Sequence, residues 1–148
     1  MKKTITKKSH FEQINLALVY VQNNYSSNIT AEDLAKVSAY SLFHFHRIFK
    51  EVTGTSVNNY IRNTRLEKAS NLLIYNCHKS IQTIALECGF STATSFTQAF
   101  KKMFLMTPKD WKKGGYEIKN SKNNISMINV DESMVLDSPK IVNNESIP

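Results

Sequence analysis

The chain of 148 residues has a net charge of +7 and is 41% hydrophobic, which is enough apolar material for one domain of ordinary size. Its 4 glycines and 3 prolines, beside 8 phenylalanines and 6 tyrosines, argue against a collagenous, low-complexity or fully disordered chain. The longest apolar runs fall far short of the roughly 20 residues that span a bilayer, and Lys2 and Lys3 are not followed by an apolar signal region. We therefore expect a cytoplasmic protein with no membrane partner.

The positive charge is concentrated in residues 1–113, which hold 16 Lys and Arg against 7 Asp and Glu. Residues 114–148 hold 3 basic and 5 acidic residues. A compact basic domain favours a polyanionic partner, although an anionic membrane surface or simple solubility would explain the same balance.

Apolar spacing over residues 11–113 predicts a series of helices with short breaks and no strand, so the expected fold class is all-α. The first helix should end near residue 24. Thr30, with Asp33 three residues later, has the pattern of a capping box before a short helix over residues 31–37. Ser41 is expected to cap the next helix, which ends at Gly54.

The second half of the domain has the same kinds of residues at the expected helix starts and ends. Ser56 opens a longer helix that reaches about Tyr75, and Ser80 caps a short helix that ends at Gly89. We expect the following helix to begin at Ser91 and to reach about residue 104. A last helix should start at Pro108, because proline at the first helical position loses no hydrogen bond. These segments add up to about seven helices.

The order of elements repeats, which indicates a tandem unit. At an offset of 50, Leu34, Ala35, Tyr40 and Ser41 match Ile84, Ala85, Phe90 and Ser91; at an offset of 51, Phe45, Phe49 and Lys50 match Phe96, Phe100 and Lys101. Each copy consists of a short helix, a tight turn and a second helix, which is the helix-turn-helix arrangement. We expect one domain over residues 10–115 with two helix-turn-helix subdomains and a long linker helix, preceded by a flexible basic N-terminus, residues 1–9, and followed by a tail, residues 116–148.

The second helix of the first copy has two different faces. Residues at helical spacing on one face are apolar and should be buried: Leu42, Phe45, Ile48, Phe49 and Val52. A separate stripe carries Phe43, His46, Arg47 and Lys50. Arginine can bond guanine with its two-pronged head, lysine neutralises phosphate, and an aromatic ring can touch a thymine methyl group, so this stripe suits a DNA major groove. An ordinary solvated face explains one such helix equally well.

In the second copy, Phe96, Ala99, Phe100 and Met103 should point inward. Thr94, Thr97, Gln98 and Lys101 should point outward, where glutamine can pair with adenine and small hydroxyls allow close approach to the DNA backbone. This stripe is less basic, so a solvated face remains a stronger alternative here.

The linker helix from Ser56 to Tyr75 is long enough, at about 1.5 Å per residue, to hold two subdomains roughly one DNA turn of 34 Å apart. Its apolar residues should pack against both subdomains: Leu66, Ala69, Leu72 and Leu73. Arg62, Arg65 and Lys68 are expected to cover the surface or contact phosphate rather than read bases.

The segment IQTIALECGFSTATSFTQAFKKMFLMTPKDWKK, residues 81–113, resembles the C-terminal motif of the AraC/XylS transcription regulators. The resemblance extends back through RLEKASNLL and FHRIFKEVTGTS to about residue 10, and the placement of the domain is similar to the MarA/SoxS/Rob subgroup. It implies a monomer that binds double-stranded DNA through two adjacent major grooves, with RNA polymerase as a further partner and activation as its role.

Carried over position by position, the resemblance implies base contacts from Phe43, His46, Arg47, Ala93, Thr94, Ser95 and Gln98. Phosphate contacts are assigned to Ser41, Lys50, Ser91, Thr97 and Lys101. Two positions depart from the family. Leu105 replaces the usual glycine, so the turn there is expected to have a different shape. Ala93 has no polar side chain, which should weaken direct base recognition by the second helix.

Other classes of function have less support. Cys77 and Cys88 are expected to be free thiols, and His44 and His46 lie too far around a helix to bind one metal ion together. No catalytic motif or cofactor-binding motif is present, so the protein is not expected to be an enzyme.

Three interpretations remain open. The first is a nucleoid-associated, sequence-specific transcription regulator. The second is a helical protein-interaction module, in which the basic stripes would meet an acidic partner. The third is the DNA-binding fragment of a larger, ligand-responsive regulator, because the tail, with its apolar residues 125–130 and 134–136, looks like the entry to a GyrI-like effector-binding domain.

Overall fold

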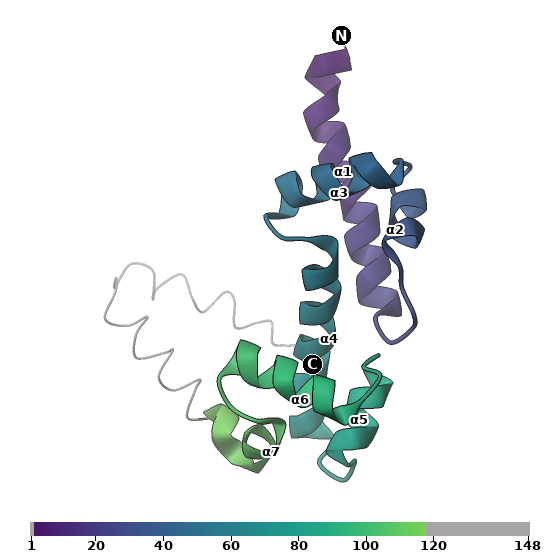
Figure 1. The fold of residues 1–148 in the computed structure, drawn as a ribbon. Coiled ribbons are helices and arrows are strands. Elements are labelled where there is room, and N and C mark those ends of the chain that lie inside the picture. Colours follow the sequence, from purple (N-terminus) through teal and green to yellow (C-terminus); the bar gives the residue numbers. More distant parts are fainter. Residues whose placement is uncertain (1, 118–148) are drawn as a thin grey trace, which may run out of the picture. The chain divides into compact units, whose positions relative to one another are not determined.

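The computed structural model describes the backbone of residues 2–117 and the side chains of residues 10–117 (Figure 1). Its described residues are helical and contain no strand, which confirms the all-α prediction. The helices are α1 (Lys2–Asn24), α2 (Ala31–Val37), α3 (Leu42–Thr53), α4 (Val57–Tyr75), α5 (Ile81–Glu87), α6 (Ala93–Phe104), α7 (Pro108–Asp110) and the π-helical turn η1 (Trp111–Gly115). Helix α1 includes the segment predicted as a flexible basic arm. The described residues belong to two units, which divide after Pro108.

Side-chain caps fix most of the helix starts. The Thr30 hydroxyl accepts a bond from the Asp33 N–H at 3.1 Å, and the Asp33 carboxylate accepts one from the Thr30 N–H at 3.1 Å. These bonds form the predicted capping box and hold the pKa of the Asp33 carboxyl below its usual value. The hydroxyls of Ser41, Ser56 and Ser80 cap α3, α4 and α5, each by accepting a bond from the backbone N–H three residues later.

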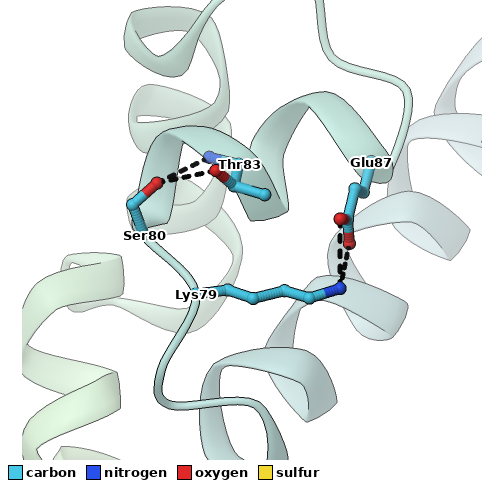
Figure 2. Close-up of polar contacts among 4 residues, drawn as sticks. All are labelled: Lys79, Ser80, Thr83 and Glu87. Atoms are coloured by element: carbon cyan, nitrogen blue, oxygen red, sulfur yellow. Dashed lines mark hydrogen bonds and ion pairs between the residues drawn. The ribbon is translucent and has the colours of Figure 1, made fainter.

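Helix α5, the first helix of the second subdomain, is held at both ends by side chains (Figure 2). The Ser80 hydroxyl accepts from the Thr83 N–H at 3.0 Å and donates to the Thr83 hydroxyl at 2.9 Å. The Lys79 ammonium donates to both oxygens of the Glu87 carboxylate, at 2.9 and 3.0 Å, and so ties the segment before α5 to its last residue. Short helices are marginal by themselves, so these contacts support a helix of 7 residues.

The predicted start of α6 is wrong by two residues. The helix was expected to begin at Ser91, but it begins at Ala93 after the N-cap Thr92, whose hydroxyl accepts from the Ser95 N–H at 3.0 Å. The turns still match at an offset of 50, because the Tyr40 N–H bonds to Ala35 and the Phe90 N–H bonds to Ala85. The inserted residue of the second copy is therefore Ser91 itself, and Thr92 is the counterpart of Ser41.

This register predicts different effects for two neighbouring substitutions. Thr92→Ala should lower the free energy of unfolding by about 1 kcal/mol, because it removes the hydroxyl that caps α6. Ser91→Ala should change it by less than about 0.5 kcal/mol, since Ser91 is exposed and makes no cap. Urea unfolding followed by circular dichroism measures both, and equal effects would contradict the corrected start of α6.

The two subdomains bury their helices with the same aromatic arrangement. In the first, the rings of Phe45 and Phe49 are 5.5 Å apart and both side chains are fully buried. In the second, Phe96 and Phe100 repeat this contact at 5.6 Å. Leu42 was predicted to be part of the core, but it is 39% exposed. It is the first residue of α3, and side chains in a helix point toward the N-terminus, so Leu42 extends beyond the face that packs on the core.

Helix α4 is shared by both subdomains and lies between them in Figure 1. Val57 and Ile61, near its start, belong to the core formed by α1, α2 and α3. Leu66, Ala69 and Leu73 are buried farther along, where α4 packs against α5 and α6, while Leu72 is half-buried. The predicted linker helix thus contributes buried residues to the apolar cores of both subdomains, as expected.

The turn after α6 keeps the geometry of its counterpart after α3, contrary to the expectation from Leu105. Gly54 ends α3 at φ 81°, and its N–H bonds to the Lys50 carbonyl at 2.8 Å. Leu105 ends α6 at φ 63°, with the same bond to Lys101 at 2.8 Å. The leucine therefore adopts the left-handed conformation that glycine normally supplies, at a steric cost.

Leu105→Gly is expected to raise the free energy of unfolding by about 0.5–1 kcal/mol. Relief of left-handed strain is worth about 1–2 kcal/mol, and the greater freedom of glycine in the unfolded chain offsets part of that gain. Little packing is lost, since Leu105 is 80% exposed. Thermal and urea unfolding measure the change, and a destabilised variant would show that the side chain contributes contacts that outweigh the strain.

The second unit begins within the last helical segment. Helix α7 begins at Pro108, as predicted, and continues into the π-helical turn, where Gly114 has φ 109°. The ring of Trp111 lies 6.0 Å from that of Tyr116. The apolar segments predicted in the tail, residues 125–130 and 134–136, lie outside the described residues.

Candidate nucleic-acid interface

The structure places the predicted base-contacting residues of α3 on its surface. Phe43 is 78% exposed, an unusual position for a large aromatic ring, and His46, Arg47 and Lys50 are also exposed. Ile48 and the Phe45–Phe49 pair lie on the buried side of the same helix. The two-faced pattern of α3 is therefore confirmed in the fold, with Leu42 as its exception.

Arg47 is held only loosely on this surface. Its nearest acidic partner is Glu51, one turn later, at 3.8 Å between Nη1 and Oε2. Both side chains are more than half exposed, so solvent screens the pair and it contributes little. The Arg47 guanidinium can therefore leave Glu51 for another acceptor at small cost.

Ser41 stands at the start of α3, and its hydroxyl is already part of the cap. It accepts from the His44 N–H at 3.3 Å and lies 3.3 Å from Nδ1 of the His44 ring. A phosphate at this end of the helix would meet backbone N–H groups as well as the serine side chain.

The exposed face of α6 carries Thr94, Gln98 and Lys101, as predicted. Ala93 and Thr97 are half-buried. Ser95 is exposed, but its hydroxyl donates to the Thr92 carbonyl and accepts from the Thr92 hydroxyl, each at 3.0 Å. Ser91, assigned to phosphate contact, is exposed in the turn before the cap. Of these residues, Thr94, Gln98 and Lys101 are thus the exposed polar ones that lie within α6 itself and make none of these capping bonds.

A groove of about 630 Å³ with mixed polar and apolar lining runs beside α6, and sequence analysis did not identify it. Arg62, Asn59 and Asn63 line it from α4, at the spacing of one helical face, and Gln98 and Lys102 line it from α6. None of its lining residues is acidic. The groove extends the basic, hydrogen-bonding surface from α6 onto α4. The i, i+3, i+4 pattern of polar residues in α4 is the sequence signal that could have revealed it.

Arg65 is only half-exposed, and its guanidinium bonds to backbone of another segment. Its Nε donates to the Tyr25 carbonyl at 2.8 Å and its Nη2 to the Ser27 carbonyl at 2.9 Å, so the guanidinium joins α4 to the segment after α1. Lys68 also faces this segment, with its ammonium 5.6 Å from the centre of the Tyr25 ring. Arg62, in contrast, is exposed and bonds to Asn59 in its own helix. Sequence spacing cannot reveal the contact of Arg65, because its partners follow a different helix.

The two cysteines lie in different surroundings, since Cys77 is exposed and Cys88 is buried. Cys77 and Cys88 are both free, as predicted. Burial raises the pKa of the Cys88 thiol to about 11, which keeps it protonated and weakly nucleophilic. Within residues 10–117 no group of three His, Cys, Asp or Glu side chains is placed to hold a metal ion.

The described helices include none with the length and apolar character needed to cross a membrane.

Comparisons with known proteins agree with this geometry. A helix-turn-helix domain family matches residues 34–114. The HTH-type transcriptional regulator YbfP of Bacillus subtilis is 43% identical over 89 residues, which cover 60% of this chain and 30% of YbfP. The transposon Tn10 TetD protein of Escherichia coli is 35% identical over 104 residues, which cover 70% of this chain and 75% of TetD.

A solved structure gives the same result for the fold. The crystal structure of a transcriptional regulator from Chromobacterium violaceum, described among AraC-type DNA-binding domain-containing proteins, matches with a TM-score of 0.65 and 28% identity. The match covers 69% of this chain and 90% of that one. The chain thus spans less than a third of YbfP but 90% of the solved Chromobacterium violaceum chain. It belongs to the AraC/XylS family of helix-turn-helix regulators.

Proposed function

We propose that this protein is a sequence-specific DNA-binding transcription regulator, an activator that binds two adjacent major grooves as a monomer. One observation carries the proposal: a single chain contains two helices, α3 and α6, that bury equivalent phenylalanine pairs and expose polar faces with hydrogen-bonding side chains. A tandem fold of this kind supplies two recognition helices without a second subunit.

The proposed division of labour follows the chemistry of each side chain. Arg47 and Gln98 would bond to base edges, with His46, Thr94 and Ser95 beside them, while Phe43 and Ala93 would contact thymine methyl groups. Ser41, Lys50, Ser91, Thr97 and Lys101 would contact phosphates. The proposed DNA-binding domain comprises residues 10–115.

The length of α4 supports binding to neighbouring grooves. Its 19 residues correspond to about 28 Å at 1.5 Å per residue, close to the roughly 34 Å between successive major-groove sites on one face of DNA. Because α3 and α6 differ in their exposed side chains, the proposed operator has two unlike halves. RNA polymerase is the proposed second partner, and the proposed location is the cytoplasm, with association to the nucleoid.

Selection from random duplexes tests this proposal directly. The purified full chain should enrich one asymmetric motif with two halves about one helical turn apart. Failure to enrich any sequence would contradict the proposal and favour a helical protein-interaction module.

Arg47→Ala should weaken binding to the selected duplex by about 1–3 kcal/mol and relax base preference at one position. The reason is that a bidentate contact discriminates between bases, whereas a phosphate contact does not. Lys50→Ala is the comparison, because it removes an exposed charge from the same helix and should weaken all sequences about equally. Competition binding against duplexes changed one base pair at a time measures both. Unchanged affinity and preference in Arg47→Ala would remove α3 from the proposed recognition surface.

A further inference from the structure

The side chain of Arg65 lies where three parts of the first compact unit meet. From α4 it donates to the carbonyls of Tyr25 and Ser27, which follow α1 of the first helix-turn-helix subdomain. Its guanidinium also lies against Gly89, in the turn between α5 and α6 of the second subdomain. A single side chain thus contacts both subdomains.

The approach at this junction is close. A methyl group added to Gly89 would lie 2.7 Å from the Arg65 Nε and 2.9 Å from the Tyr25 carbonyl oxygen. Burial raises the pKa of the Tyr25 hydroxyl, and the nearby Cys88 and Glu87 of the second subdomain add to the rise. The Arg65 guanidinium, bonded to the backbone of the first subdomain, therefore lies next to the backbone of the second at Gly89.

Other contacts between the subdomains pass mainly through α4. In the described residues, α4 packs against α1 and α3 on one side of the junction and against α5 and α6 on the other. No helix of the first subdomain is packed extensively on α5 or α6. An α-helix can bend, so a connection through α4 alone would let α3 and α6 change their relative positions. A direct contact between the two subdomains constrains these positions further.

We infer that Arg65 is a positioning residue that sets the placement of α3 relative to α6, and thereby the half-site spacing that this protein accepts. The inference rests on the proposed function only for its consequence on DNA. When two binding modules are linked, their joint affinity is greatest if the linker holds them at the distance between the two DNA half-sites. A looser linker lowers the affinity at this spacing but reduces it less at other spacings.

The first test uses the free protein. Spin labels at Glu51→Cys on α3 and Lys102→Cys on α6, in a Cys77→Ser background, report the distance between the two helices; all three sites are exposed and Cys88 is buried. Arg65→Ala should broaden the distance distribution. Arg62→Ala is the matched control, because it removes the same charge from the same helix but breaks only a bond within α4. Equal widths in wild type and Arg65→Ala would overturn the inference, whatever the result of DNA selection.

The second test varies the spacing of the two halves of the selected duplex. Inserting or deleting one base pair should weaken wild-type binding by about tenfold or more, because it rotates and displaces one half-site. Arg65→Ala should bind the native spacing about three- to tenfold less tightly, lose less than about threefold on changed spacings, and bind an isolated half-site like wild type. Arg62→Ala removes a cation of the candidate interface, so it should weaken binding to all spacings about equally, without the loss of spacing preference expected for Arg65→Ala. Lys36→Ala, on α2 outside the proposed interface, should keep both the wild-type affinity and the wild-type spacing profile.

Two outcomes overturn the positioning role. In the first outcome, Arg65→Ala loses the same factor of affinity, relative to wild type, on the isolated half-site as on the full site. This would mean that Arg65 supports folding and does not set the spacing. Arg65→Lys keeps the charge and the stem but lacks the two-pronged geometry that reaches both carbonyls, so its spacing profile should lie between those of wild type and Arg65→Ala. If both variants lose their helical signal in circular dichroism, Arg65 is required for the fold itself and the inference fails.

Discussion

Raising the salt concentration from about 50 to about 200 mM should lower the affinity for the selected duplex by about 10³- to 10⁵-fold. The expectation assumes contact with about six to ten phosphates, each of which releases condensed counterions when a cation neutralises it. The surface offers the necessary groups. Lys50, Lys101 and Lys102 are exposed on α3 and α6, Arg62 lies in the groove beside them, and the capped N-termini of both helices present backbone N–H groups.

The slope of log affinity against log salt makes this test specific to DNA. Lys101→Ala should reduce the slope by about one, because it removes one proposed phosphate contact. Lys36→Ala is the matched control: it is equally exposed and equally charged, but it lies on α2, outside the proposed interface, and should leave the slope unchanged. A shallow slope with no preference among duplexes would instead favour an acidic protein partner.

Local signals predicted the helices well, because each cap needs only residues three positions apart. Thr30, Ser41, Ser56 and Ser80 cap the helices assigned to them. The exception, Ser91, precedes a second residue with a hydroxyl, and either could cap a helix. Thr92 is the cap because its hydroxyl accepts a bond from the N–H three residues later, that of Ser95. The sequence does not show which residue takes this place, because the second copy of the repeat has one inserted residue.

The surface of a single helix could be predicted from the sequence, whereas surfaces that combine several helices could not. The exposed stripe of α3 follows from helical periodicity, so the exposure of Phe43, His46 and Arg47 was predicted. The groove between α4 and α6 and the contacts of Arg65 need tertiary structure, because their residues come from different helices. Arg62 and Arg65 look alike in the sequence, yet one is exposed and the other ties two subdomains together.

Gly89→Ala should lower the free energy of unfolding by about 2–5 kcal/mol, the largest effect that we expect from a single methyl group in this protein. Two contributions add. The residue has φ +98°, where a side chain is strained by about 1–2 kcal/mol. Its new methyl group would also overlap Arg65 and the Tyr25 carbonyl, and overpacking of this kind costs about 1–3 kcal/mol. Urea unfolding of the full chain measures the loss.

Two positions separate strain from overlap. Gly54 has φ +81° with no atom within 4 Å of an added methyl group, so Gly54→Ala should cost only the strain of about 1–2 kcal/mol. Ala39, the counterpart of Gly89 in the first copy, already carries a methyl group at φ 63° and is exposed. A positive φ alone therefore does not exclude alanine from this turn, and the close approach of Arg65 and Tyr25 is what requires glycine at position 89. If Gly89→Ala were no more destabilising than Gly54→Ala, the junction would be loose, and Arg65 could not hold the two subdomains in one arrangement.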